Sequence, residues 1–186
     1  MDASDETFVD RDFRNEGLLY RDVDDCLFKS CDFQEVSLKA KRFVDCVFEE
    51  CNLSVADVMS ATFRDCVFKR CKLVGINWSA TTRCEEIVFD ECVLNNATFM
   101  NLDLRHFVFR KSVLRDVDFS DADLRKADFR HTDLAGATFR NTDLREADFR
   151  GADHYAIDAT HNKLQDARFE LPAAVALLQG LGVILD

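Results

Sequence analysis

The stretch Asp121–Asp153 reads DADLRKADFRHTDLAGATFRNTDLREADFRGAD, and Leu or Phe recurs in it at every fifth position. The same spacing runs outward in both directions, from Phe8 to Trp78 and, after one extra residue, from Phe89 to Phe149. A period of five fits neither the helical period of about 3.6 nor the two-residue alternation of a strand. A fixed period over most of a chain indicates a repeat architecture. We therefore predict a solenoid.

The eight cysteines reveal a longer period. Cys26/Cys31, Cys46/Cys51 and Cys66/Cys71 recur at intervals of twenty residues. Twenty residues hold four of the large apolar positions, which indicates a coil with four sides, and successive coils should stack about 4.8 Å apart. We expect an all-β solenoid, a quadrilateral β-helix, over residues 6–170, with a register break at 79–84. One side should carry a column of phenylalanines: Phe8, Phe28, Phe48, Phe68, Phe89, Phe109, Phe129, Phe149 and Phe169.

The cysteines and histidines do not form a pattern typical of a reactive site. Most cysteines lie two positions before a large apolar residue, where Ala stands in later repeats. Such cysteines are expected to be small buried hydrophobes rather than zinc ligands or disulfides. His106, His131, His154 and His161 fall on different sides or coils, and His154 should pack beneath the C-terminal tail. We predict no catalytic residue, no metal, no cofactor and no enzyme activity.

Charge narrows the class of partner. The chain has 24 Lys and Arg against 35 Asp and Glu, and residues 1–60 alone hold 15 acids and 7 bases. Nucleic acids and anionic membranes attract basic surfaces, so neither is expected as a direct ligand, and a basic protein is favoured. The acidic N-terminus lacks the apolar core of a signal peptide, and no apolar run could span a bilayer. A cytoplasmic location is expected.

The register breaks once, because eleven residues separate Trp78 from Phe89 where ten are due. Residues added to a solenoid bulge from one face. Residues 79–84 therefore form either a tolerated bulge that bends the rod or a short recognition loop that uses Arg83 and Glu85.

Unwrapping the chain on the twenty-residue period places many acidic residues on one side. The side includes an outward column that ends in Glu146 and Asp166 and is interrupted by His106 and Lys126. The column is either a solvated face or a stripe that imitates the phosphates of duplex DNA. The column begins with Asp25, Asp45, Asp65 and Glu86. The same side also carries Asp22, Asp103, Asp123 and Asp143. The last three of these are each followed two residues later by an arginine that could neutralise them, namely Arg105, Arg125 and Arg145.

A second outward column is apolar. It consists of Leu27, Val47, Val67, Val88 and Val108. β-branched residues suit an extended face, so the column is structural, although a contiguous exposed strip could also bind a partner.

The pattern ends before residues 171–186, which read as a short helix and an apolar tail. Pro172 suits a first helical turn and Gly180 a helix end. Leu171, Val175 and Leu178 form an apolar face, and Leu181 follows it. The segment could cap the open end of the solenoid, join two copies of the chain, or do both.

The small–polar–Leu/Phe–polar–polar pattern, clearest in Asp121–Asp153, resembles the pentapeptide repeat family over about residues 6–169. This resemblance implies that the quadrilateral β-helix is right-handed. The terminus HYAIDATHNKLQDARFELPAAVALLQGLGVILD and the Cys-rich stretch Asp45–Trp78 resemble the topoisomerase-protecting members of the family. These are the Qnr-type quinolone-resistance proteins and the immunity proteins for albicidin and microcin B17.

The resemblance implies a cytoplasmic homodimer, joined through the C-terminal helix, that binds DNA gyrase and possibly topoisomerase IV in place of DNA. The acidic side would then be the binding face. The alternative is a repeat scaffold or effector that binds an unrelated protein.

Overall fold

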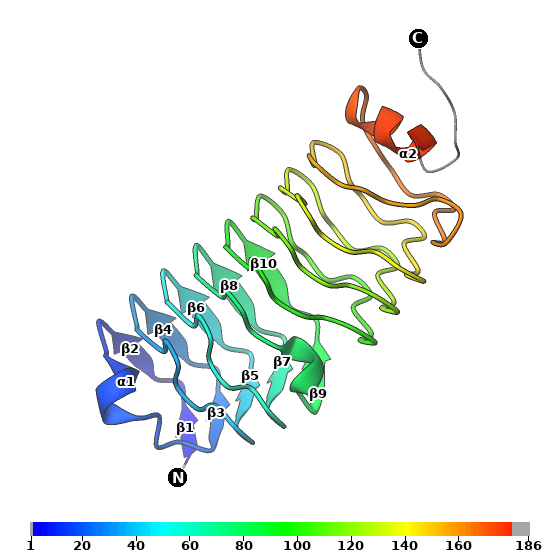
Figure 1. The fold of residues 1–186 in the computed structure, drawn as a ribbon. Helices are drawn as coiled ribbons and strands as arrows, with labels where there is room; N and C mark the ends of the chain where they lie inside the picture. The colour runs from blue at the N-terminus through cyan, green and yellow to red at the C-terminus, as the bar shows by residue number, and fades with distance from the viewer. Residues whose placement is uncertain (1, 180–186) are drawn as a thin grey trace.

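The computed structural model describes residues 2–179, which form a parallel β-solenoid capped by short helices (Figure 1). One sheet has the order β1-β3-β5-β7-β9, and its strands are β1 (Asp2–Ser4), β3 (Asp22–Asp24), β5 (Arg42–Val44), β7 (Thr62–Arg64) and β9 (Arg83–Glu85). The other has the order β10-β8-β6-β4-β2, and its strands are β2 (Thr7–Val9), β4 (Leu27–Lys29), β6 (Val47–Glu49), β8 (Val67–Lys69) and β10 (Val88–Asp90).

Each residue in these sheets pairs with the residue twenty positions later, or twenty-one across the register break. Phe28 pairs with Phe48, and Phe68 pairs with Phe89. Isolated parallel bridges continue this register on the other two faces and along the C-terminal half, to Asp148 and Arg168. The predicted right-handed quadrilateral β-helix with a short C-terminal helix is confirmed. The pairing starts at Asp2, before the expected boundary at residue 6.

The core is a set of stacked columns, because the residues of the five-residue register, which we call central, point inward from Ala3 to Phe149 and lie over their equivalents in the next coil. The rings of Phe28 and Phe48 stack with centroids 4.8 Å apart and planes 9° from parallel. Phe28 also meets Phe33 of the neighbouring column edge to face at 5.4 Å. Aromatic pairs in these geometries add about 0.5–1.5 kcal/mol beyond the burial of their area. Every coil is thus held to its neighbours by the core as well as by the backbone.

The position two residues before each central residue carries hydrogen bonds as well as small side chains. All eight cysteines are free and buried, and the seven that occupy this position, all except Cys84, donate hydrogen bonds through their thiols. The thiol of Cys51 donates to the carbonyl of Phe28 in the preceding coil at 3.3 Å, and the hydroxyl of Thr142 donates equivalently to Phe119 at 3.1 Å. Burial raises the pKa of the Cys66 thiol, which keeps this donor protonated.

Ala is therefore not the only residue that suits this position. Phe107, which lies outside the five-residue register, is buried at one such position, and its ring lies 6.0 Å from that of Phe109.

Within residues 2–179, four short helices interrupt or end the coils. Helix α1 (Phe13–Glu16) begins at Asp12, whose carboxylate accepts the backbone N–H of Arg14. The 3₁₀ helix η1 (Trp78–Ala80) forms the bulge at the register break. The 3₁₀ helix η2 (Ala173–Val175) runs into α2 (Ala176–Gln179) over the last coil. No helix among residues 2–179 is both long and apolar enough to cross a membrane.

The expectation for His154 is wrong. Its side chain is 67% exposed, and Nδ1 lies 3.0 Å from the Asp133 carboxylate. Tyr155 and Ile157 are buried in its place. The last coil departs from the register here, so a histidine in a nominally central position faces solvent.

The corners between faces adopt the left-handed backbone conformation. Asp25, Asp45 and Asp65 have φ angles of 50°, 51° and 52°. In this conformation the corner N–H points along the solenoid axis, and Asp25 donates to the Val44 carbonyl at 3.0 Å. A residue other than glycine raises the conformational energy by roughly 1–2 kcal/mol when it adopts this backbone conformation, and the axial hydrogen bonds offset that cost.

Val55 is the corner residue least suited to its backbone. Its φ is 59°, and its side chain is 57% exposed. A β-branched side chain at positive φ is strained, whereas Asn tolerates this conformation. The strain of Val55 is not offset by burial.

We predict that Val55→Asn raises the free energy of unfolding by about 1 kcal/mol because it relieves this strain. Urea unfolding followed by circular dichroism measures the change. Val9→Asn is the matched control, since Val9 is 48% exposed but lies in the extended strand β2. Equal effects of the two substitutions would show that strain at the corner is not the cause.

Candidate functional site

The first four residues of the predicted acidic column lie at one corner of the solenoid, where the β3-β5-β7-β9 sheet turns toward the β4-β6-β8-β10 sheet. All four are exposed and have positive φ angles. We call these residues the acidic corner: Asp25, Asp45, Asp65 and Glu86. Their place on an edge, rather than on the flat of a face, leaves their carboxylates open to solvent or to a partner on two sides.

Most of the acidic corner is electrostatically uncompensated. Among residues 2–179, Asp65 has a cation within 4.0 Å, since Arg64 Nε lies 3.2 Å from its carboxylate. Asp25, Asp45 and Glu86 have no ion pair in that part of the chain, and neither has Asp22 in β3. Carboxylates stacked at the coil spacing of about 4.8 Å repel one another. A basic ligand would relieve that repulsion.

Three other predicted acids have a different setting, on the flat of the face. Asp103, Asp123 and Asp143 pair in register along the axis, and each accepts hydrogen bonds from the arginine two residues later. Each distance from Nη2 of Arg105, Arg125 or Arg145 to the carboxylate is 2.6 Å. We call these six residues the Asp–Arg ladder. The predicted neutralisation by arginine is confirmed.

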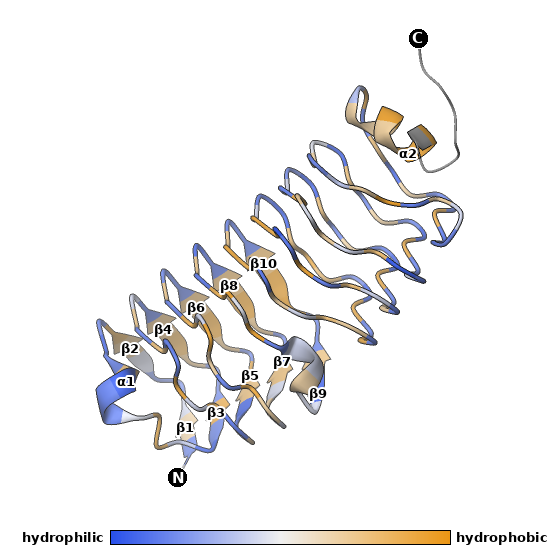
Figure 2. Cartoon of the chain, in the orientation of Figure 1, coloured by the Kyte–Doolittle hydropathy of each residue, from blue (hydrophilic) through white to orange (hydrophobic). Residues whose placement is uncertain are grey.

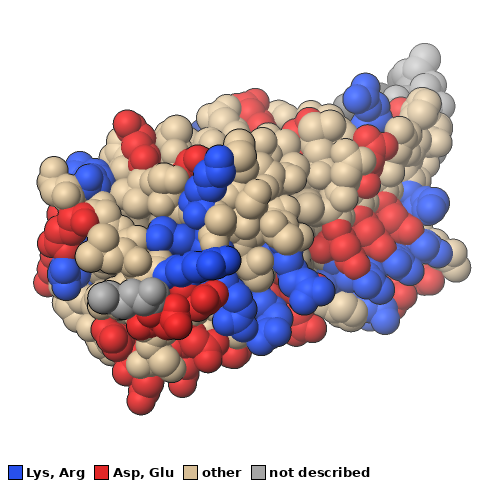
Figure 3. Space-filling view, turned by 90° about the horizontal axis from the view of Figure 1, so that it is seen from below, with Lys and Arg blue, Asp and Glu red and all other residues tan. Residues whose placement is uncertain are grey.

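The ladder and the acidic corner therefore differ in charge. The arginine hydrogen bonds hold the pKa values of Asp103, Asp123 and Asp143 below the usual range. Figure 3 shows acidic and basic side chains in adjacent bands toward the C-terminal end of this face, and a mainly acidic edge toward the N-terminal end. The last two predicted acids are exposed, and Lys126 Nζ lies 3.7 Å from Glu146, whereas Asp166 has no ion pair within residues 2–179.

The register break opens a seam on the face that carries the ladder. Thr62 pairs with Arg83, and Asp103 pairs with Asp123, but within the described chain no bridge joins Arg83 to Asp103. The other three faces remain paired across the same level. Cys84 occupies the central position there, and its side chain is smaller than that of Phe63 before it.

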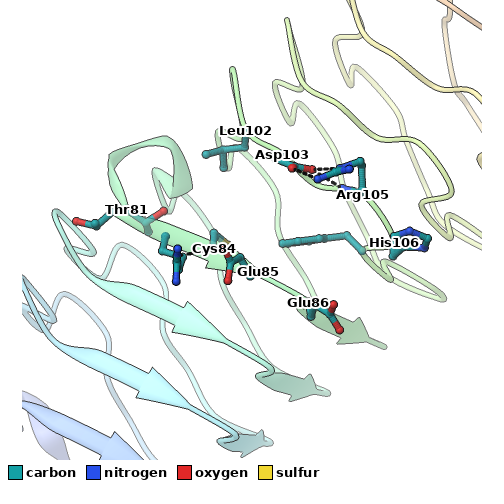
Figure 4. A pocket seen from close by; sticks show the side chains of 11 residues that line it. Thr81, Cys84, Glu85, Glu86, Leu102, Asp103, Arg105 and His106 are labelled. Atoms are coloured by element: carbon teal, nitrogen blue, oxygen red, sulfur yellow. Dashed lines mark hydrogen bonds and ion pairs between the residues drawn. The ribbon is translucent and has the colours of Figure 1, made fainter.

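The seam holds a hollow of about 480 Å³ between β9 and residues 102–107 (Figure 4). Two ion pairs lie in its lining: Arg83 Nε lies 3.1 Å from the Glu85 carboxylate, and Arg105 is bound to Asp103, whereas Glu86 has no ion pair within residues 2–179. Burial raises the pKa of the Cys84 thiol, so that thiol is not an activated nucleophile. Within residues 2–179, no cluster of His, Cys, Asp and Glu side chains could hold a metal ion.

Of the two interpretations of residues 79–84, the structure shows a bulge, η1, followed by strand β9. Arg83 and Glu85 belong to β9 and bind each other at the rim of the hollow. A role for them in recognition stays a prediction.

The C-terminal helices leave apolar side chains exposed. Leu171 is 76% exposed, and Val175 and Leu178 are each 37% exposed. Ala173 and Leu177 pack against the core and close the end of the solenoid. Leu181, the fourth predicted dimer residue, lies outside the described residues.

Sequence reasoning missed three further pairs of the same kind as the ladder, one of which joins Arg14 to Asp12, with Arg14 Nη2 2.9 Å from the carboxylate. Arg130 and Arg150 bind Asp128 and Asp148 on the neighbouring face, each at 2.6 Å. The recurrent Asp-x-Arg spacing is the signal that could have found them.

Comparison with known proteins places this fold in a family. The sequence matches the pentapeptide repeat region over residues 21–85 and 83–149. No curated protein matches it. A solved structure of trypsin-treated QnrB1, a plasmid-mediated fluoroquinolone resistance protein, is similar to it with 15% sequence identity, full coverage of both chains and a TM-score of 0.65.

A second similar structure is HetL of Nostoc sp. strain PCC 7120, a protein involved in heterocyst differentiation regulation. It is 21% identical, covers 90% of this chain and 86% of its own, and has a TM-score of 0.47. At these identities the likeness concerns the fold alone. The family match covers most of the chain, and we conclude that the chain belongs to the pentapeptide repeat family.

Proposed function

We propose that this protein binds DNA gyrase, and possibly topoisomerase IV, in place of DNA and so protects the enzyme from topoisomerase poisons. It would act as a binding protein in the cytoplasm, without catalysis or a cofactor. The observation that carries the proposal is the uncompensated acidic corner, which runs along the axis of a rod-shaped molecule. The fold of QnrB1, a fluoroquinolone resistance protein, supports it.

The charge of the acidic corner suits a DNA-binding surface. Such a surface is basic because it must hold phosphates. Duplex DNA presents one charge per about 1.7 Å of axis, whereas the corner presents one per coil of about 4.8 Å. The protein is thus a weaker electrostatic ligand than DNA, suited to competing with it reversibly rather than to displacing it permanently.

The other acids of the predicted face would contribute to the negative electrostatic field of the acidic corner to different extents. Asp22 lies at the start of β3, three residues before the corner residue Asp25, and has no ion pair within the described chain. The Asp–Arg ladder contributes shape and hydrogen-bonding groups more than net charge, because each carboxylate has an arginine bound to it.

We predict that replacing Asp25, Asp45 and Asp65 with Asn and Glu86 with Gln weakens binding to gyrase about tenfold or more at low salt. The substitutions remove four exposed charges without touching the core. Binding by the unmodified protein should also fall steeply as salt increases, and that dependence should flatten in the variant. Fluorescence anisotropy with labelled protein measures both effects, and relief of drug-induced cleavage tests protection.

The matched control replaces the same kind of corner residue elsewhere. Asp116 and Asp121 are exposed acids at other corners, with φ angles of 56° and 60°. Their replacement with Asn should leave gyrase binding nearly unchanged. If the unmodified protein binds neither gyrase nor topoisomerase IV, the alternative of a scaffold for an unrelated protein holds instead.

We further propose that the exposed apolar side chains of the C-terminal helices join two copies end to end. The charge introduced by Leu178→Asp would have to be buried in that contact, so the variant should be monomeric where the unmodified protein is a dimer. Light scattering at micromolar concentration distinguishes the two states. Leu19→Asp is the control, since Leu19 is 77% exposed at the other end of the solenoid. A monomeric unmodified protein would refute the dimer.

A further inference from the structure

The sheet of β4, β6, β8 and β10 exposes a continuous apolar row beside the acidic corner. Its members pair with one another in register along the axis, and each is only half-buried. We call them the apolar row: Leu27, Val47, Val67, Val88 and Val108. Figure 2 shows the strands of this sheet largely in the hydrophobic colours. Five coils spaced about 4.8 Å apart give the row a length of roughly 19 Å.

The two borders of the apolar row differ in charge. On one side lies the acidic corner, because each of its four acids precedes a row residue by two positions. On the other side the outward residues alternate in sign and are paired across coils. Arg110 lies 2.9 Å from Asp90, Lys111 lies 3.2 Å from Glu91, and Arg70 binds Glu49 and Glu50. The complementary ligand therefore has one apolar stripe and one basic stripe.

The distance between coils indicates which secondary structure the ligand should have. Three coil intervals span roughly 14 Å, and three turns of an α-helix span roughly 16 Å. The mismatch of about 2 Å is within the reach of flexible lysine and arginine side chains. A strand along the axis repeats each face every two residues, or about 6.7 Å, so it would overshoot by about 6 Å over the same distance.

We propose that the apolar row and the acidic corner together form a docking surface for a basic amphipathic α-helix that lies along the solenoid axis. The apolar stripe of the helix covers the row, and its lysines or arginines meet the corner carboxylates. Duplex nucleic acid and anionic membranes have the wrong sign of charge for this surface. The inference does not depend on gyrase being the partner, because it concerns a surface that any protein with such a helix would fit.

A labelled helical peptide of about four turns provides the probe, with leucine every three or four residues and lysine after each leucine. Fluorescence anisotropy should show binding to the unmodified protein, while a peptide of the same composition in scrambled order should bind at least tenfold more weakly. Far-ultraviolet circular dichroism should show the peptide gaining helix in the complex. Equal binding of the two peptides would overturn the proposal.

Two pairs of variants separate the apolar and the charged contributions. Val47→Thr with Val67→Thr keeps the β-branched shape and should weaken peptide binding about fivefold to tenfold at every salt concentration. Asp45→Asn with Asp65→Asn should weaken it mainly at low salt. Val93→Thr with Val113→Thr is the matched control, since these half-buried valines pair in the equivalent row of the next face.

Equal weakening by the control pair would refute docking on the apolar row. The variants also test a second copy of the chain as the occupant. If sedimentation shows that Val47→Thr with Val67→Thr dissociates a dimer, the row is a self-association surface and the helix proposal is wrong. The peptide assay contains no topoisomerase, so its failure and a failure to bind gyrase are separate results.

Discussion

Backbone pairing between residues twenty positions apart is the constraint on which the whole molecule depends. Because one coil stacks on the next, each side chain must share its column with the equivalent side chains of its neighbours. In the core, this constraint stacks the ring of Phe28 on that of Phe48 at 4.8 Å. On the surface, it aligns the aspartates of the Asp–Arg ladder along the axis. A residue of unsuitable size or charge therefore disturbs the packing of the adjacent coils as well as that of its own coil. The columns are sorted by residue type for this reason.

The same constraint explains how much could be inferred from the sequence. The core columns and the Asp-x-Arg pairs were predictable because each follows directly from a period. The acidic corner was predictable as a column but not as an edge, because corner residues share a backbone angle rather than a chemical type: Asp25, Ser30, Ala40 and Arg70 all have positive φ. His154 faces solvent and Tyr155 is buried because the last coil departs from the register locally, and a period cannot predict its own interruption.

The two halves of the solenoid handle charge in different ways. Toward the C-terminus, arginines two residues after the acids turn potential repulsion into bidentate pairs. Toward the N-terminus, residues 1–60 hold 15 acids against 7 bases, and much of the acidic corner has no partner within the described chain. An unpaired column of like charge lowers stability, and this column lies beside an apolar row, which is the basis of our proposal that the surface serves recognition.

The seam beside β9 has a mechanical consequence. A solenoid resembles a one-dimensional chain of coupled units, each in contact only with its neighbours. Three faces carry that coupling across the seam and the ladder face does not, so we expect this junction to resist bending less than a junction that is paired on all four faces. We therefore expect bending of the rod to concentrate at positions such as the seam. Opening of the seam would bend the rod away from the ladder face without unfolding a coil.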